Sequence, residues 1–195
     1  MARRILWSRA QHRSAFVDRY LGGLTGVEIG GAAHNDYGLD ALNVDRFGEM
    51  DTIYKQEEWR LSGRKRPVDV VAPGEALPFA DDSFDFVFAS HVIEHFADPI
   101  GALQEWIRVA RKYVVLVVPH PDRTFDRGRE LTSAAELLRR HEGDVTGDTE
   151  GHHWSVWTHE SFLDFCRDLD VEVVDSLDPD DKVGNGFMVV IDAGR

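Results

Sequence analysis

Five of the nine histidines in this 195-residue chain fall where loops should follow the ends of predicted strands. Imidazole titrates near neutral pH, so each ring is a candidate general base for a hydroxyl or an amine. His120 is the strongest candidate, because Pro119 and Pro121 restrain the loop that aims its ring. We predict as candidate catalytic residues His120, His91, His153 and His152; the fifth histidine, His95, is expected mainly to shape a turn.

Two of these histidines share a short segment with Trp154 and Trp157. The tryptophans either wall a substrate pocket or simply pack in the core. If the segment is extended, His152 and His153 point in opposite directions, so at most one of them faces a substrate.

A metal hypothesis also arises from residues after the fifth predicted strand. Ligand types occur at His120, Asp122, Asp126, His152 and His153. Their spacing matches no recognised ligand motif, so the sequence predicts no metal site. The charged run 122–129 is expected to be a solvated loop, with a substrate clamp by one of its arginines as the alternative.

The elements that must position these side chains follow from the hydrophobic pattern. Apolar runs predict strands at 26–30, 41–45, 68–72, 84–89, 113–118, 171–175 and 187–191. Helical spacing and caps predict helices at 6–21, 46–61, 98–111, 132–141 and 159–168. Strands that alternate with helices predict an α/β fold, a doubly wound and mostly parallel seven-stranded sheet. The turn-rich loop before the last strand predicts an antiparallel hairpin at the C-terminal edge.

The ends of the first two strands indicate a ligand pocket. Glycine at Gly30 and Gly31 lets the backbone approach a ligand that a Cβ would repel, although a tight turn without a ligand explains the pair equally well. The carboxylate of Asp45 is placed to accept hydrogen bonds from a ribose diol. A Gly-x-Gly-x-x-Gly fingerprint is missing after the first strand, which argues against a nicotinamide-dependent oxidoreductase.

Residues 75–99, EALPFADDSFDFVFASHVIEHFADP, resemble the central motif of class I S-adenosylmethionine-dependent methyltransferases that act mostly on small molecules. The resemblance extends over about residues 24–120 and implies a Rossmann-like methyltransferase fold with S-adenosylmethionine as cofactor. Together with the Gly-Gly bend, it implies a cofactor-binding set of Glu28, Gly30, Gly31, Asp45, Glu75, Ala76, Ser90 and His91.

The chain departs from this family pattern in its cofactor loop. Ala32 and His34 replace the usual second and third glycines, and Pro73 stands where an acid often binds the adenine amine. Only about eleven residues separate the first two strands, so the usual helix between them is missing or reduced to a turn. The run GAAHNDYGLDALNVD resembles a variant found among methyltransferases of sugar and natural-product pathways.

Two functions remain open at this stage. The first is methyl transfer to oxygen or nitrogen of a small metabolite, such as a sugar or a natural-product intermediate. The second is a methyltransferase-fold protein that does not methylate, acting as a ligand-binding or accessory subunit or catalysing a different reaction in the same pocket.

Composition narrows the partners and the location. The net charge of −13, from 35 acidic and 22 basic residues, repels phosphate backbones and argues against nucleic acid. No apolar run approaches the ~20 residues that span a bilayer, and the first residues do not resemble a signal peptide, so we expect no membrane partner and a cytoplasmic location. The single cysteine, Cys166, is expected at a buried helix position.

We expect one methyltransferase-like domain over residues 1–195. It divides into an N-terminal helical arm (1–23), a cofactor-binding half (24–120) and a substrate-side half (121–195). The expected partner is a small-molecule substrate, and the sequence leaves a homodimer open.

Overall fold

A computed structural model describes residues 13–143 and 153–194 of the chain. Seven strands form one sheet in the order β3-β2-β1-β4-β5-β7-β6. Their bounds are Thr25–Ile29 (β1), Asp40–Asp45 (β2), Val70–Val71 (β3), Phe84–Ser90 (β4), Ala110–Pro119 (β5), Val173–Leu177 (β6) and Gly186–Asp192 (β7). The first five strands are parallel, while β7 is antiparallel to both β5 and β6. The predicted fold class is confirmed.

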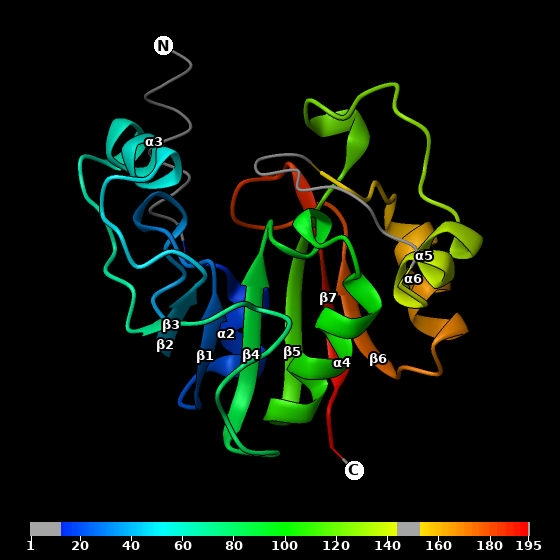
Figure 1. Cartoon of the computed structure of the whole chain (residues 1–195), viewed down its shortest axis with the longest axis horizontal. Helices are drawn as coiled ribbons and strands as arrows, with labels where there is room; N and C mark the ends of the chain where they lie inside the picture. Colours follow the sequence, from blue (N-terminus) through cyan, green and yellow to red (C-terminus); the bar gives the residue numbers. More distant parts are fainter. Residues whose placement is uncertain (1–12, 144–152, 195) are drawn as a thin grey trace.

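Helices lie on both faces of this sheet (Figure 1). The α-helices are Ala15–Leu21 (α2), Ile53–Ser62 (α3), Pro99–Val109 (α4), Ala134–His141 (α5) and His159–Asp168 (α6). Three short 3-10 turns are Ala33–Asn35 (η1), Ile93–His95 (η2) and Pro121–Arg123 (η3). None of the helices in the described residues is long and apolar enough to span a membrane.

Alternation along β4 shows how the two layers form. Phe86 and Phe88 pack in the cluster that contains the apolar side of α2, whereas Val87 and Ala89 pack in the cluster on the α4 and α6 side. All four side chains are buried, because a parallel strand in mid-sheet is covered on both faces. The sheet therefore provides a rigid platform for the loops at its edge.

Helix starts follow their predicted caps. The Asp98 side chain accepts a hydrogen bond from the Gly101 N–H at 3.0 Å, with Pro99 as the first helical residue of α4. Thr158 and Ser161 form a capping box at the start of α6. Ser133, rather than Thr132, caps α5.

Several predicted bounds are wrong. The helix expected over 46–61 begins only at Ile53, because the Asp45 carboxylate accepts a hydrogen bond from the Phe47 N–H and holds the chain in a turn. Helix α4 ends at Val109, since Ala110 already pairs with Phe84 in the sheet. In addition, β3 is shorter than predicted and β6 begins two residues later. Residues 6–12 of the first predicted helix lie outside the described residues, and its described part is α2.

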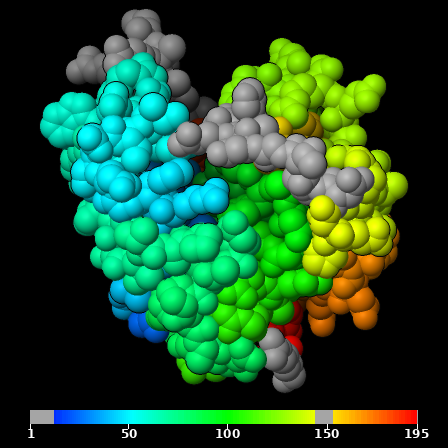
Figure 2. Space-filling view, in the orientation of Figure 1, coloured from blue at the N-terminus to red at the C-terminus, as the bar shows by residue number. Residues whose placement is uncertain are grey.

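The short connection between β1 and β2 contains only the turn η1, as the spacing predicts. Figure 1 shows the carboxyl ends of the parallel strands at one edge of the sheet, at the top of the view. Above this edge, α3 rises on one side and the loop after β5 on the other, with the β4 end and its following turn between them (Figures 1 and 2). Ligands of open α/β sheets bind at such an edge, so the candidate site is sought there.

Candidate active site

The backbone bends sharply after β1. Gly30 has a φ of +65°, a conformation that glycine adopts without strain, and its N–H donates to the Val44 carbonyl at 2.8 Å. Gly31 is more confined, because a Cβ there would lie 2.7 Å from Asn43 Oδ1 and 2.8 Å from Arg66 Nη1. The Gly-Gly bend thus has a structural cause in this protein, which is close packing against its own side chains.

Glu28 lies beneath this bend, 2% exposed, and forms an ion pair with Arg66 at 2.5 Å. Burial raises the pKa of its carboxyl group, while the Arg66 charge opposes that rise. Arg66 is held in turn through its backbone, since Glu58 accepts hydrogen bonds from the N–H groups of Arg66 and Ala33. Sequence reasoning missed Arg66, which comes from the loop before β3 and is not adjacent to the motif it contacts.

The end of β2 places Asp45 at the sheet edge, half-buried, with Oδ1 accepting the Phe47 N–H at 3.0 Å. The next loop carries Glu75 and Ala76, and both are exposed. Trp106 anchors this loop from α4, because its indole N–H donates to the Gly74 carbonyl at 2.8 Å.

Ser90 at the end of β4 connects to the loop after β1. Its hydroxyl accepts a hydrogen bond from Asn35 Nδ2 at 2.9 Å. The other amide atom, Asn35 Oδ1, is buried without a hydrogen-bond partner among the described residues. Acceptors at Asn35, Glu28 and Asp45 suit a ligand with an ammonium group and a ribose diol, so these residues fit S-adenosylmethionine. The guanidinium group of Arg66 competes for Glu28.

The turn after β4 carries an unusual backbone conformation. His91 has a φ of +57°, which is rare for a residue other than glycine and is typical of strained functional sites. Its side chain is about a quarter exposed, and burial lowers the pKa of the imidazole to about 4. His91 is therefore neutral at physiological pH and offers a nitrogen lone pair.

Four polar side chains meet beside this turn, and we call them the His-Glu cluster: His91, Glu94, His95 and His153. Glu94 is fully buried, and neither carboxylate oxygen has a hydrogen-bond partner among the described residues. Burial raises the pKa of its carboxyl group to about 8. Its Oε1 lies 3.8 Å from Nε2 of both His95 and His153 and 4.0 Å from Nδ1 of His91.

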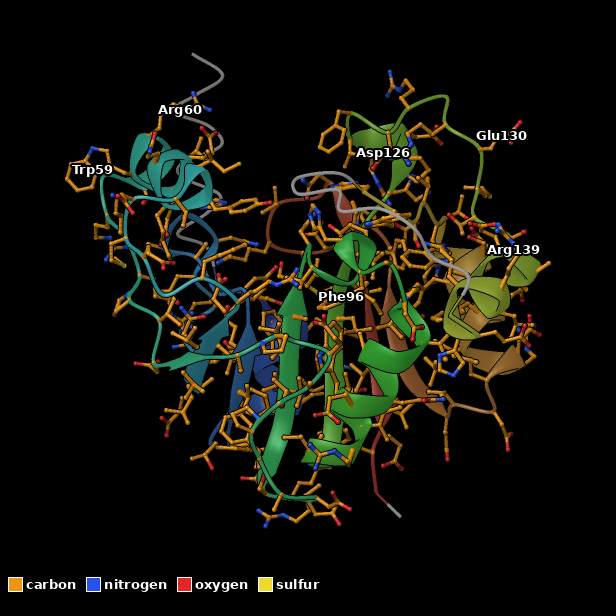
Figure 3. The ribbon with its side chains drawn as sticks, viewed as in Figure 1. Trp59, Arg60, Phe96, Asp126, Glu130 and Arg139 are labelled. Atoms are coloured by element: carbon orange, nitrogen blue, oxygen red, sulfur yellow. The ribbon has the colours of Figure 1, made fainter. Side chains whose placement is uncertain are left out.

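His153 reaches the cluster from the segment before α6. Its Nδ1 lies 2.6 Å from Asp126 Oδ2, and both residues are buried. This pairing keeps the proton on Nδ1 and leaves the Nε2 lone pair directed toward Glu94. Asp126, on the loop after β5 (Figure 3), is fixed by an ion pair with Arg129. The expectation of a solvated loop at 122–129 is therefore wrong at Asp126, which is 1% exposed.

The structure brings only some of the predicted histidines together. His120 lies at the end of β5 against Phe187, where its Nδ1 accepts the Asp122 N–H at 3.2 Å. A neutral ring in that arrangement carries its proton on Nε2 and acts as a donor. His152 lies outside the described residues. Trp157 packs in the core against Phe162 and Phe165, so of the two roles considered for it, pocket wall or core packing, the structure shows core packing.

From the sequence, Glu94 and His95 were expected mainly to shape the turn. The signal that could have found them is the charge of Glu94 directly after the apolar pair Val92-Ile93 in the motif. A carboxylate in such a position is buried with the turn, and a buried charge calls for a partner.

A family model described as a methyltransferase domain matches residues 21–118. An uncharacterized methyltransferase of Mycolicibacterium vanbaalenii is 36% identical over 91 residues, which cover 46% of this chain and 36% of that protein. A ubiquinone/menaquinone biosynthesis C-methyltransferase of Geotalea daltonii is 35% identical over 80 residues, which cover 41% of this chain and 34% of that protein. These matches span only about a third of the length of either relative.

Among solved structures, a SAM-dependent methyltransferase of Thermotoga maritima, described as a possible histamine N-methyltransferase, is similar with a TM-score of 0.55. The two chains are 20% identical, and the similarity covers 96% of this chain and 89% of that one. At this identity the likeness shows the fold alone.

Proposed function

Because the chain belongs to the methyltransferase-domain family, whose model matches half of it, we propose that it transfers a methyl group to an oxygen or nitrogen atom of a small metabolite. S-adenosylmethionine is the cofactor that family membership and the name of the similar solved structure indicate. The observation that carries the proposal is the placement of the His-Glu cluster at the end of β4, directly after Ser90 and its contact with the β1 loop.

The proposed role of each candidate residue follows from its position at the sheet edge. Glu28, Asn35 and Asp45 supply acceptors for the cofactor's ammonium group and ribose hydroxyls, and Gly30 and Gly31 keep the bend close to them. The remaining cofactor-binding candidates, Glu75, Ala76, Ser90 and His91, flank the same edge of the sheet. When bound, S-adenosylmethionine supplies a methyl group that is already activated by the sulfonium. The protein then needs to orient the acceptor and remove its proton.

Proton removal falls to the imidazoles near the end of β4. His153 has the best-defined lone pair, because Asp126 fixes its tautomer. His91 is the next candidate, as burial keeps it neutral. His120 and His152 remain candidates from the sequence, the former with its Nδ1 already engaged. The exposed ring of Phe125 lies 4.5 Å from the His153 ring and offers an apolar contact for an acceptor.

Calorimetric titration of the chain with S-adenosylhomocysteine tests the cofactor site. The Asp45→Ala substitution removes a charged acceptor and should weaken binding at least about tenfold, since such hydrogen bonds contribute about 1.5–3 kcal/mol. Asp40→Ala, an exposed aspartate at the opposite end of the same strand, is the matched control and should leave binding unchanged. An affinity for S-adenosylhomocysteine that Asp45→Ala leaves unchanged, or no binding at all, would contradict the proposal.

A methyl-transfer assay identifies the acceptor. Hydroxylated sugars and amines are offered with labelled cofactor, and the methylated atom is located by NMR. A product methylated at carbon would contradict the assignment to oxygen or nitrogen, and it is the outcome that the name of the Geotalea daltonii relative suggests.

The second candidate function is a protein of this fold that does not methylate. The contact of Arg66 with Glu28 and Gly31 favours it, because a guanidinium group there competes with a cationic cofactor. If neither S-adenosylmethionine nor S-adenosylhomocysteine binds the unmodified chain, but binding appears in Arg66→Ala, this candidate is supported over the first.

A further inference from the structure

The His-Glu cluster has a geometry that the folding of the turn alone does not explain. Glu94 is 0% exposed, and both of its carboxylate oxygens lack hydrogen-bond partners among the described residues. Leaving a buried carboxylate unpaired costs several kcal/mol, on the order of the whole stability margin of many domains. A buried carboxyl group of this kind either holds a proton or has a cationic partner.

The ion-pair contacts given for the Glu94 carboxylate in the described residues are to imidazoles, those of His91, His95 and His153. The carboxylate of Asp126, which acts on Glu94 by its charge, already has Arg129 as its counter-charge. When the imidazoles are neutral, the described residues offer an ionised Glu94 no counter-charge. A bound cation would supply one.

The distances favour a shared ion over direct hydrogen bonds. The Glu94 Oε1 to His153 Nε2 distance of 3.8 Å is too long for a hydrogen bond, and so is the distance to His95 Nε2. Ligand atoms about 2.1 Å from one tetrahedral ion lie about 3.4 Å apart. One ligand atom from each of Glu94, His95 and His153 fits within 4.8 Å of the others, so small side-chain shifts bring all three onto one ion.

The surroundings hold these ligands in place. The Asp126 carboxylate against His153 Nδ1 is the carboxylate–histidine arrangement that orients metal-binding imidazoles. The Glu94 carbonyl accepts backbone hydrogen bonds from Trp154 at 2.7 Å and Ser155 at 3.2 Å, which fastens the His153 segment to the η2 turn. The ligands thus come from two distant segments that the fold joins rigidly.

We propose that Glu94, His95 and His153 bind one divalent transition-metal ion such as Zn²⁺ or Mn²⁺, with His91 beside it and Asp126 orienting His153. Two imidazoles and one carboxylate suit such ions, whereas Mg²⁺ and Ca²⁺ prefer all-oxygen sites. Three protein ligands leave a coordination position for an oxygen of the acceptor, such as a hydroxyl or carboxylate group. The ion would lower the pKa of a bound hydroxyl, whose proton would then pass to solvent, and His153 would act as a ligand instead of a base. This last role rests on the proposed methyl transfer, but metal binding does not.

The metal alone is the probe. The full chain is stripped with a chelator, and Zn²⁺ is titrated by calorimetry, Co²⁺ by visible absorption and Mg²⁺ in parallel. We expect one Zn²⁺ or Co²⁺ per chain, a Co²⁺ spectrum that indicates nitrogen ligands, and much weaker binding of Mg²⁺. Glu94→Gln, which keeps the side-chain shape, and His153→Ala should each weaken Zn²⁺ binding at least about 100-fold, and Asp126→Asn about 10–100-fold.

His141→Ala is the matched control. His141 pairs with Asp98 on a different helix and lies outside the cluster, so its loss should leave Zn²⁺ affinity unchanged. Thermal unfolding of each metal-free variant establishes that it folds; should His153→Ala fail to fold, Glu94→Gln and the Co²⁺ spectrum of the unmodified chain decide. Absence of Zn²⁺ and Co²⁺ binding, or binding that Glu94→Gln leaves intact, would overturn the proposal. No cofactor enters this titration, so its failure is distinct from failure of the methyltransferase proposal.

Discussion

Replacing two buried tryptophans by phenylalanine should give unequal losses of stability. Trp106 and Trp157 are both at most 1% exposed and belong to the same core cluster. Their indole N–H groups differ, because that of Trp106 donates to the Gly74 carbonyl, whereas that of Trp157 has no partner among the described residues. The pair therefore isolates one hydrogen bond against a matched background of packing.

The expected magnitudes follow from these contacts. Loss of part of the indole creates a small cavity in either variant, at a cost of about 1–2 kcal/mol. Trp106→Phe also leaves the buried Gly74 carbonyl without its donor, which adds about 1–3 kcal/mol. Trp157→Phe instead removes an unsatisfied buried donor, which offsets most of its packing loss. The free energies of unfolding should differ by at least about 2 kcal/mol, or about 4–8 °C in Tm.

Urea unfolding followed by far-UV circular dichroism measures both values. An unchanged m-value in both variants is the control for two-state unfolding. Because Trp106 anchors the loop that carries Glu75, Trp106→Phe should also weaken S-adenosylhomocysteine binding, while Trp157→Phe should not. Equal losses of stability, or a larger loss in Trp157→Phe, would refute the hydrogen-bond argument.

Three further predictions concern other parts of the chain. Burial raises the pKa of the Cys166 thiol to about 12, so thiol reagents should modify the native protein only at the rate of its unfolding; rapid labelling would contradict this. Gly31→Ala places a Cβ within 3 Å of Arg66 and should destabilise the protein by about 1–3 kcal/mol and impair cofactor binding, as urea unfolding and calorimetry would measure. Arg111 holds the pKa of Asp85 at about 2, below its unfolded value of 3.8. Above pH 4 this pair should therefore contribute about 1 kcal/mol to the free energy of unfolding, and this contribution should disappear as the pH falls through 2. Asp85→Asn should flatten that part of the curve of unfolding free energy against pH.

Elements governed by local sequence were predictable. Asp98 and Pro99 specify the start of α4, and Thr158 that of α6, because a cap acts on backbone groups within one turn. The seven apolar runs predict the strands for the same reason, since alternation and β-branching are properties of adjacent residues. The helix predicted from residue 46 failed where a side chain, Asp45, stabilised a turn instead.

The cofactor side of the site was partly predictable. The Gly-Gly bend and the acid at the end of β2 lie where the sequence places them, at the carboxyl edge of the sheet. The sequence could not show that Arg66 pairs with Glu28, because the loop before β3 reaches the bend only once β1, β2 and β3 lie side by side. The cofactor contacts of the predicted residues themselves remain a proposal.

By itself, the sequence determined the α/β fold, the methyltransferase motif and the strand ends at which polar residues collect. Only the tertiary structure decided which of those residues meet. It brings His153 to Glu94 and Asp126, buries Asp126 in a loop expected to be solvated, and surrounds Glu94 with imidazoles from two distant segments. The physical reason is that strand propensity and capping act within a few residues, whereas burial and charge pairing depend on segments that approach only after the whole chain has packed.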